Sequence, residues 1–272
     1  MSPPASSSAS SSHRRPAGPR RPLPPVDERL VAPETRYEII DGKVEYVAPA
    51  DEPHGTRHSK ISALLEAYAA DGFDVASDML TRTSEGGDMA PDASVFPAAR
   101  DPETGGRQIE QLAFEVVSTE RLSHAAKKAR NLVARGVRRV FAVDVERRRA
   151  LAWSTETNSW EILPSDGAIT DPALALPLPI RPLVEAARAD DAIAAALIAK
   201  KNPVITAAIE EGKVRGRLQG KVAALLAILS VRKIEVRKKA RKQIETCDDE
   251  SEIDRWLARA VTASTLDDVL GA

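Results

Sequence analysis

Residues 90–96 read APDASVF, and residues 112–118 read LAFEVVS. Both stretches are short, apolar and rich in β-forming residues, so we expect two buried strands. Each stretch nevertheless carries one acid, Asp92 in the first and Glu115 in the second. Because a buried carboxylate without a partner costs several kcal/mol, each acid must be protonated, hydrogen-bonded or bound to a metal ion.

The segments around these two strands predict an α/β domain over residues 31–183. Asp41-Gly42 lies between two β-rich runs, which is a hairpin signal. Helical spacing predicts a helix over residues 58–70 and a second one over residues 121–137, where Gly136 ends it. The connections containing SEGGD and DPETGG are expected to be loops. Further strands are expected at residues 73–80, 138–145, 149–155 and 159–164.

The two ends of the chain differ from this domain in composition. Residues 1–30 are rich in Ser, Pro and Arg and have little to bury, so we expect a disordered tail. After residue 183 the strand patterns cease, and helical patterns predict an all-α module over residues 184–272. Ser264 is the expected N-cap of the last helix. The expected core of the module consists of Trp256, Leu257, Ala260, Leu266 and Leu270.

Composition limits the compartment and the class of protein. The 272 residues include 39 Lys+Arg and 40 Asp+Glu, so overall charge favours no particular partner. The single cysteine, Cys247, allows no internal disulfide and favours a reducing compartment, so a cytoplasmic location is expected. No apolar run approaches the roughly 18 residues of a membrane span, and no membrane association is predicted.

Two carboxylates on paired strands, with a lysine nearby, suit metal-assisted phosphodiester cleavage. Carboxylates bind hard divalent cations through oxygen, and a lysine adds a compact positive charge. Lys127 and Lys128 lie in the helix that follows Glu115. The simpler alternative is that Asp92 caps a strand end and that Glu115 lies on the solvent face of an edge strand.

The order of these segments resembles that of a known family. Six segments follow one another in an order similar to that of the Uma-type family of proposed restriction endonucleases. They are RYEIIDGKVEYVAP, HSKISALL, PDASVF, LAFEVVS, a lysine-bearing helix and ARGVRRVFAVDVERRRALAW. That family belongs to the PD-(D/E)XK nuclease superfamily, and the resemblance covers residues 35–165. It implies a restriction-endonuclease-like mixed sheet flanked by helices, with a site for Mg²⁺ or Mn²⁺.

The resemblance also implies roles for individual residues. Asp92 and Glu115 would be the metal ligands, and Glu38 would be the acid from the opening element that assists the metal or the water. The superfamily motif has a lysine two residues after the second acid, where this chain has Val117. In this family the lysine comes instead from the following helix, which indicates Lys128, with Lys127 as its rival.

Other polar residues are alternative candidates for a site. His54 and His58 are four residues apart, which would place both on one helix face, as in some metal sites. With no third ligand close in sequence, a helix-start and surface role is the preferred interpretation, although His58 matches a family position. His124 is expected on a helix face, and Asp144 is expected in a turn after a strand.

The helical module carries two further signals. Gly212, Gly216 and Gly220 recur every four residues in a predicted helix, where each costs roughly 1 kcal/mol relative to Ala. They indicate a close helix–helix approach, which could lie between subunits, or else a broken helix. Residues 231–243 hold seven basic residues and one acid, which could contact phosphates or form a solvated face. The nucleic-acid-binding candidates are Arg237, Lys238, Lys239, Arg241 and Lys242.

The module resembles helical C-terminal modules of bacterial transposase-like and nuclease-like proteins. The preferred hypothesis is therefore a metal-dependent DNA endonuclease that uses Glu38, Asp92, Glu115 and Lys128. The alternative is a catalytically inactive protein of the nuclease fold that binds nucleic acid or serves in assembly. DNA is the expected partner. A homodimer is an alternative to a monomer, since many nucleases of this fold use two subunits to cut both strands.

Overall fold

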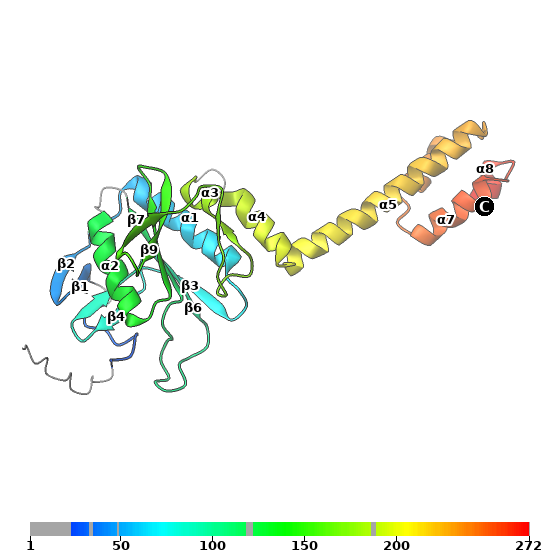
Figure 1. Ribbon diagram of the computed structural model, residues 1–272. Coiled ribbons are helices and arrows are strands. Elements are labelled where there is room, and N and C mark those ends of the chain that lie inside the picture. Colours follow the sequence, from blue (N-terminus) through cyan, green and yellow to red (C-terminus); the bar gives the residue numbers. More distant parts are fainter. Residues whose placement is uncertain (1–22, 33–34, 48, 118–121, 186–188, 272) are drawn as a thin grey trace, which may run out of the picture. The chain divides into compact units, whose positions relative to one another are not determined.

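The computed structural model describes the chain except for residues 1–22, 33–34, 48, 118–121, 186–188 and 272. The chain divides into two compact units, Met1–Ile193 and Ala194–Ala272, and the division falls within helix α4 (Ala189–Ala199) (Figure 1). Within the described residues, no single helix has both the length and the apolar character to cross a membrane. The bent pair of α4 and α5 (Pro203–Val231) meets those criteria only jointly, by length and composition.

The first unit is built on a six-stranded sheet in the order β10-β9-β8-β7-β6-β3 (Figure 1). β7 and β8 run parallel, and the other neighbours run antiparallel. Every residue of β7 is buried, as are five of the six in β8, which is typical of parallel strands covered on both faces. The strands are β3 (Phe73–Ser77), β6 (Ala93–Pro97), β7 (Leu112–Val117), β8 (Arg139–Asp144), β9 (Arg149–Ser154) and β10 (Ser159–Ile162).

The helices that contact this sheet include α1, α2 and α3 (Ile180–Val184). α2 (Leu122–Arg135) is the crossover between the parallel strands β7 and β8, and Gly136, at φ 123°, follows its last residue as predicted. α1 (Glu52–Tyr68) contacts β3, β6 and β7. It begins earlier than predicted because the Asp51 side chain accepts a hydrogen bond from the His54 N–H and so caps the helix.

A second, four-stranded sheet has the order β2-β1-β5-β4 and is antiparallel. The predicted hairpin at Asp41-Gly42 is confirmed: both residues have positive φ, as a two-residue turn of type I′ requires. The rest of this sheet was not predicted. Its strands are β1 (Tyr37–Ile40), β2 (Lys43–Tyr46), β4 (Thr81–Ser84) and β5 (Gly87–Met89).

The prediction for residues 73–88 was therefore wrong in two places. The expected strand over residues 73–80 ends at Ser77, because Asp78 adopts a left-handed conformation with φ 50°. The SEGGD segment, expected to be a loop, is instead the turn between β4 and β5 and the start of β5. The remaining elements of this unit are β11 (Ala168–Ile169), β12 (Leu178–Pro179) and α3 (Ile180–Val184).

The prediction of a tail over residues 1–30 was wrong for residues 23–30. Residues 1–22 lie outside the described residues, whereas the following segment contacts the first unit. Val26 is buried and its carbonyl accepts a 2.9 Å hydrogen bond from the Arg82 N–H. The Asp27 carboxylate accepts from the N–H of Arg107 at 2.9 Å. Residues 23–30 are thus held by hydrogen bonds on the folded unit rather than forming part of a tail.

The second unit is helical and has its own core. The predicted core residues all belong to it, with Trp256 and Ala260 buried and the three leucines partly buried. The last helix is capped by Thr265 rather than by Ser264, because Thr265 and Asp268 form a capping box. The helices are α5, α6 (Lys238–Glu245), α7 (Glu250–Ala260) and α8 (Leu266–Leu270).

The three glycines of α5 do not form a close contact within the described chain. α5 is continuous from Pro203 to Val231, so the helix is not broken at them. A Cβ atom built at Gly212, Gly216 or Gly220 would meet nothing within 4 Å. The predicted close helix–helix approach is therefore wrong for the described residues of one chain, because this part of α5 is exposed.

Candidate active site

The two acids of the opening stretches lie opposite each other across two paired strands. β6 and β7 pair antiparallel with Ala93 opposite Phe114, and extending this register by one residue places Asp92 opposite Glu115. Side chains of opposite residues lie on the same face of a sheet. The N–H of Val116 donates a hydrogen bond to Asp92 Oδ2, which ties the Asp92 carboxylate to the neighbouring strand.

Lys128 completes a buried group of charges. The buried stripe of α2 consists of Ala125, Lys128, Ala129 and Leu132, so the helical period directs Lys128 toward the sheet. Its Nζ lies 2.9 Å from Glu115 Oε2 and donates a 2.6 Å hydrogen bond to the carbonyl of Ala90. The lysine is 6% exposed, so the sequence alone would not place it in the core.

Lys127, the residue before Lys128, lies beside Glu45 and not beside Glu115. Its Nζ is 3.9 Å from Glu45 Oε1, and its side chain is 48% exposed. His124, on the same helix, lies 3.2 Å from the other oxygen of Glu45. Of the two rival lysines, the structure therefore brings only Lys128 together with Asp92 and Glu115.

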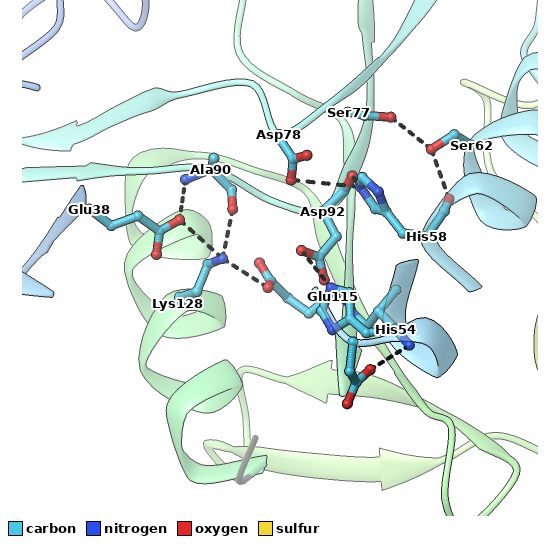
Figure 2. Close-up of polar contacts among 12 residues, drawn as sticks. Glu38, His54, His58, Ser62, Ser77, Asp78, Ala90, Asp92, Glu115 and Lys128 are labelled. Atoms are coloured by element: carbon cyan, nitrogen blue, oxygen red, sulfur yellow. Dashed lines mark hydrogen bonds and ion pairs between the residues drawn. The ribbon is translucent and has the colours of Figure 1, made fainter. Parts of the chain in front are cut away.

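Glu38 reaches the same group from the second sheet. Its Oε1 lies 3.3 Å from Lys128 Nζ and accepts a 2.7 Å hydrogen bond from the N–H of Ala90. Ala90 thus donates its N–H to Glu38 and accepts from Lys128 through its carbonyl. Figure 2 shows Glu38, Lys128, Glu115 and Asp92 following one another across the site.

Burial and like charges shift the pKa values of this group. Burial raises the pKa of Glu115 well above its usual value, and the neighbouring Asp92 and Glu38 carboxylates add to the effect although Lys128 opposes it. Burial acts against the Lys128 ammonium, but the Glu115, Glu38 and Asp92 carboxylates outweigh it and raise its pKa well above the usual value. Lys128 is therefore held as a cation.

The opposite effect dominates at Asp92. Burial by itself would raise its pKa, but a hydrogen bond with His54, the charge of Lys128 and the Val116 N–H outweigh burial and lower the pKa. An ionised carboxylate is the form that binds a cation.

Two histidines and a second aspartate, Asp78, lie on the far side of Asp92. His54 Nε2 is 3.6 Å from Asp92 Oδ1, and His58 Nε2 is 3.7 Å from Asp78 Oδ1. His58 Nε2 also contacts the main-chain oxygen of Asp92. The expected helix-start position is confirmed, since both histidines lie in the first two turns of α1. The surface part of that interpretation was wrong, because their side chains are only 19% and 18% exposed and contact acids from distant parts of the chain. Their four-residue spacing was the available signal, whereas Asp78 had none.

Of the other predicted site residues, Asp144 belongs to the first unit and the basic candidates belong to the second. Asp144 is buried at the end of β8, where it accepts hydrogen bonds from the Arg147 N–H and from Arg149 Nε, which confirms a turn role. The basic candidates belong to the second unit, at or within α6, and all of them are exposed: Arg237, Lys238, Lys239, Arg241 and Lys242.

Comparison with family profiles assigns the chain to a known family. Residues 25–181, more than half of the chain, match the profile of the Uma2 family, described as "Putative restriction endonuclease". The chain belongs to the Uma2 family. Among solved structures it is similar to a putative nuclease of DUF820 from Anabaena variabilis ATCC 29413, with 16% identity, a TM-score of 0.47, and coverage of 57% of this chain and 93% of that one. No curated protein matches the chain.

The residues of this Uma2 protein suit a divalent cation. Glu115 Oε1 is buried and has no hydrogen-bond partner among the described residues, although a carboxylate oxygen in such a place requires one. A cation between Glu115 and Asp92 would satisfy this oxygen. The donors around it are carboxylates, which are the ligands that Mg²⁺ and Mn²⁺ prefer.

Proposed function

We propose that this Uma2 protein is a metal-dependent DNA endonuclease that hydrolyses phosphodiester bonds by means of metal-activated water. The observation that carries the proposal is the position of Lys128 Nζ, 2.9 Å from Glu115 and 3.3 Å from Glu38, beside a carboxylate oxygen that has no partner among the described residues. A purely structural ion pair would not require three acids around one lysine. Membership of the Uma2 family supports a nuclease, whereas the metal ion and the DNA substrate are part of the proposal.

Asp92 and Glu115 would hold the cation, Mg²⁺ or Mn²⁺. When bound, the cation would acidify a water molecule and offset negative charge on the phosphate. Asp92 is fixed for this role by the Val116 N–H. Glu115 is fixed through its second oxygen by Lys128, so Oε1, which has no hydrogen-bond partner among the described residues, would be the oxygen that binds the cation.

Lys128 and Glu38 would act on the substrate side. A buried ammonium orients the attacking water or stabilises charge on the phosphorus centre in the transition state. Glu38 holds that ammonium in place, and its hydrogen bond from Ala90 fixes the carboxylate in turn. Glu38 is therefore a positioning residue in this proposal, and Lys128 is a catalytic one.

DNA is the proposed substrate, and exposed cations of the second unit would add affinity for its backbone. Arg237, Lys238, Lys239 and Lys242 face solvent and can approach phosphates, whereas Arg241 lies 3.4 Å from Glu245. A homodimer would provide two sites for two strands. The single cysteine supports a cytoplasmic location.

Cleavage of supercoiled plasmid and of duplex oligonucleotides in Mg²⁺ and in Mn²⁺ tests the proposal. Wild-type protein should nick or linearise the DNA, whereas Asp92→Ala and Glu115→Ala should each lose activity. Asp74→Ala is the matched control, because Asp74 is an exposed acid on the neighbouring strand β3. Equal cleavage by all variants would indicate a contaminant. Absence of cleavage in every divalent metal would favour the inactive binding or assembly protein.

A further inference from the structure

A small cavity opens at the start of α1, and the proposed function does not use it. Its volume is about 200 Å³, and it is lined by Glu52, Pro53, Thr56, Arg57 and Val145. Four of these residues belong to the first two turns of α1, and Val145 follows the last residue of β8. Glu52, Pro53 and Thr56 are exposed, so the cavity is accessible from solvent. Arg57 is the buried member of the set and decides what the cavity can hold.

Arg57 is a buried charge without an acidic partner. It is 8% exposed, and it forms no ion pair with a carboxylate of the described residues. Its Nη1 donates a 3.1 Å hydrogen bond to the carbonyl of Leu183, whereas its Nε has no hydrogen-bond partner in the part of the chain that the structure describes. Arginine stays protonated in proteins, and a buried charge that lacks a counter-charge is strongly unfavourable. The cavity therefore presents a cation that requires an anion.

The other buried arginines of the described chain do have acidic partners. Arg107 has the same exposure as Arg57, and its Nη1 lies 2.9 Å from Glu110 Oε1. Arg82 is also buried, and its Nη1 lies 3.5 Å from Glu28 Oε1. Where this fold buries those two guanidinium groups, it supplies a carboxylate to each. Arg57 departs from that pattern, and it is the arginine that lines the cavity.

A second cation, Arg148, acts on Arg57. It lies in the turn between β8 and β9, and its charge adds to burial, the larger cause, in lowering the pKa of Arg57. The arginines on either side of it are paired, since Arg147 and Arg149 lie 3.4 and 3.0 Å from Asp144 Oδ2. Arg148 is exposed and forms no ion pair with residues inside the described ranges. An anion between the two guanidinium groups would replace their repulsion by attraction.

The acid that lines the cavity, Glu52, does not compensate Arg57. It is exposed and forms no ion pair with Arg57. The N-terminus of α1 is capped by the Asp51 side chain, which accepts from the His54 N–H. The positive charge available in the cavity thus comes from arginine side chains and not from the helix end. Because the Glu52 carboxylate repels an entering anion, neutralising Glu52 should strengthen the binding of that anion.

We propose that Arg57 and Arg148 bind one phosphate group in this cavity, with the Thr56 hydroxyl as a further donor. A guanidinium carries several N–H donors in a fixed plane and so matches the oxygens of a phosphate. The phosphate would come either from the backbone of bound DNA or from a small phosphate compound.

The position of the cavity favours a phosphate of the DNA backbone. Pro53, which lines the cavity, directly precedes His54, and His54 Nε2 lies 3.6 Å from Asp92 Oδ1 at the proposed cation site. A DNA strand with its scissile phosphate at Asp92 would therefore pass the start of α1, where Arg57 would hold another phosphate of the same strand. This choice of source rests on the proposed function, whereas the phosphate site itself does not. Arg57 and Arg148 would position the strand and take no part in the chemistry.

Binding to the full chain in the presence of a chelator tests the site, because the chelator removes the metal ions that cleavage would require. Fluorescence anisotropy measures the affinity for a duplex oligonucleotide as salt is varied, and isothermal titration in chloride buffer measures the affinity for inorganic phosphate. Arg57→Gln and Arg148→Gln should each weaken binding by roughly tenfold or more, as expected for the loss of a hydrogen bond to a charged group. Glu52→Gln should tighten it. Arg147→Gln is the matched control, since Arg147 lies in the same turn but pairs with Asp144.

The salt dependence counts the phosphates that the site holds. The double variant Arg57→Gln with Arg148→Gln should lower the slope of log DNA affinity against log salt by about 0.9, the value for one phosphate. A decrease of twice that size would show that the two arginines bind separate phosphates and would contradict a shared site.

Stability in phosphate-free buffer distinguishes an uncompensated Arg57 from a structural one. Arg107→Met should lower the denaturant midpoint, because Glu110 loses its partner. Arg57→Met should lower the midpoint far less or raise it, because it removes a buried charge that has no counter-charge. Added inorganic phosphate should raise the midpoint of wild type more than that of Arg57→Met. Equal losses in Arg57→Met and Arg107→Met, with equal responses to phosphate, would reject the site.

The two probes separate the sources. If DNA affinity depends on Arg57 and Arg148, the backbone contact is supported, whether or not inorganic phosphate also binds there. If only phosphate binding depends on them, the ligand is a small phosphate compound and the backbone contact is rejected. If neither probe distinguishes these variants from Arg147→Gln, the phosphate site is rejected. Nicking in Mg²⁺ decides the proposed function separately, since Asp92 and Glu115 are intact in every variant. Circular dichroism establishes folding, and Arg148→Gln, in an exposed turn, tests the site even if Arg57→Gln does not fold.

Discussion

Lys128 Nζ lies 2.9 Å from Glu115 Oε2, although the lysine comes from a helix and the acid from the strand before it. The superfamily motif places both residues on one strand, two positions apart. Here Val117 occupies that strand position and is buried against Ala125 of α2. The ammonium group beside Glu115 therefore comes from Lys128 of helix α2 and not from a lysine of strand β7.

Replacement of Lys128 by Met should abolish most activity while leaving DNA binding in place. A preorganised donor in an active site contributes roughly 10²- to 10³-fold to rate, so we expect a loss of that order in metal-dependent nicking. Lys127→Met is the matched control, since Lys127 is adjacent in sequence but lies beside Glu45. Equal losses in both variants would contradict the assignment of Lys128.

The same substitution should also destabilise the metal-free protein. Removal of one partner from a buried ion pair costs about 3–5 kcal/mol because the other charge stays buried. Denaturant unfolding of Lys128→Met and Lys127→Met, both in the presence of a chelator, measures the difference. A free energy of unfolding for Lys128→Met equal to that of Lys127→Met would show that Glu115 and Glu38 do not need the ammonium.

Sequence reasoning located the two acids because their strands are short, apolar and adjacent in the chain. The pairing of β6 with β7 follows from these local patterns. The role of Lys128 rested on family resemblance, since a lysine in a helix gives no sign of being buried. The structure supports its place through the stripe of α2 that it shares with Ala125 and Leu132.

The second sheet and Asp78 could not be predicted because the segments that form them lack an apolar strand pattern. β4 and β5 consist largely of polar residues and glycine, and pattern reading takes such segments as loops. They form strands because β5 pairs with the distant strand β1, and because Asp88 accepts hydrogen bonds from the N–H groups of Leu30 and Val31. Contacts between residues this far apart in the chain leave no local signal.

The raised pKa of Glu115 predicts a specific pH dependence of stability. A folded-state pKa above the ordinary value of about 4.3 means that the native state binds the proton more tightly than the unfolded state does. The contribution of Glu115 to the free energy of unfolding is therefore fully present below the ordinary pKa. It is lost as the pH rises through the raised pKa of the folded state. Glu115→Gln removes this contribution.

Denaturant unfolding of wild type and Glu115→Gln between pH 4.5 and 8, with a chelator present, checks this dependence. The free energy of unfolding of wild type minus that of the variant should fall with rising pH, by no more than about 1.4 kcal/mol per pH unit. A difference that rises with pH, or stays constant, would contradict the raised pKa.

The cations of α6 should affect DNA binding but not recognition of sequence. Each lost phosphate contact lowers the slope of log affinity against log salt by about 0.9. The triple change of Lys238, Lys239 and Lys242 to Gln should weaken binding uniformly across sequences and flatten that slope. Lys213→Gln is the control, because Lys213 is exposed but lies 2.7 Å from Glu210 and is already compensated. Unchanged salt dependence in the triple variant would indicate that α6 is a solvated face.

The glycines of α5 test whether this helix has a partner outside the chain. A Cβ at Gly212, Gly216 or Gly220 meets nothing within 4 Å, so Ala at these exposed helical positions should stabilise the second unit by about 0.5–1 kcal/mol each. Thermal unfolding of the triple Ala variant, followed by light scattering of the folded protein, measures stability and subunit number together. A gain in stability without a change in mass means that the glycines face solvent. A loss of stability, or a dimer that dissociates in the variant, would instead show that they pack against a second subunit.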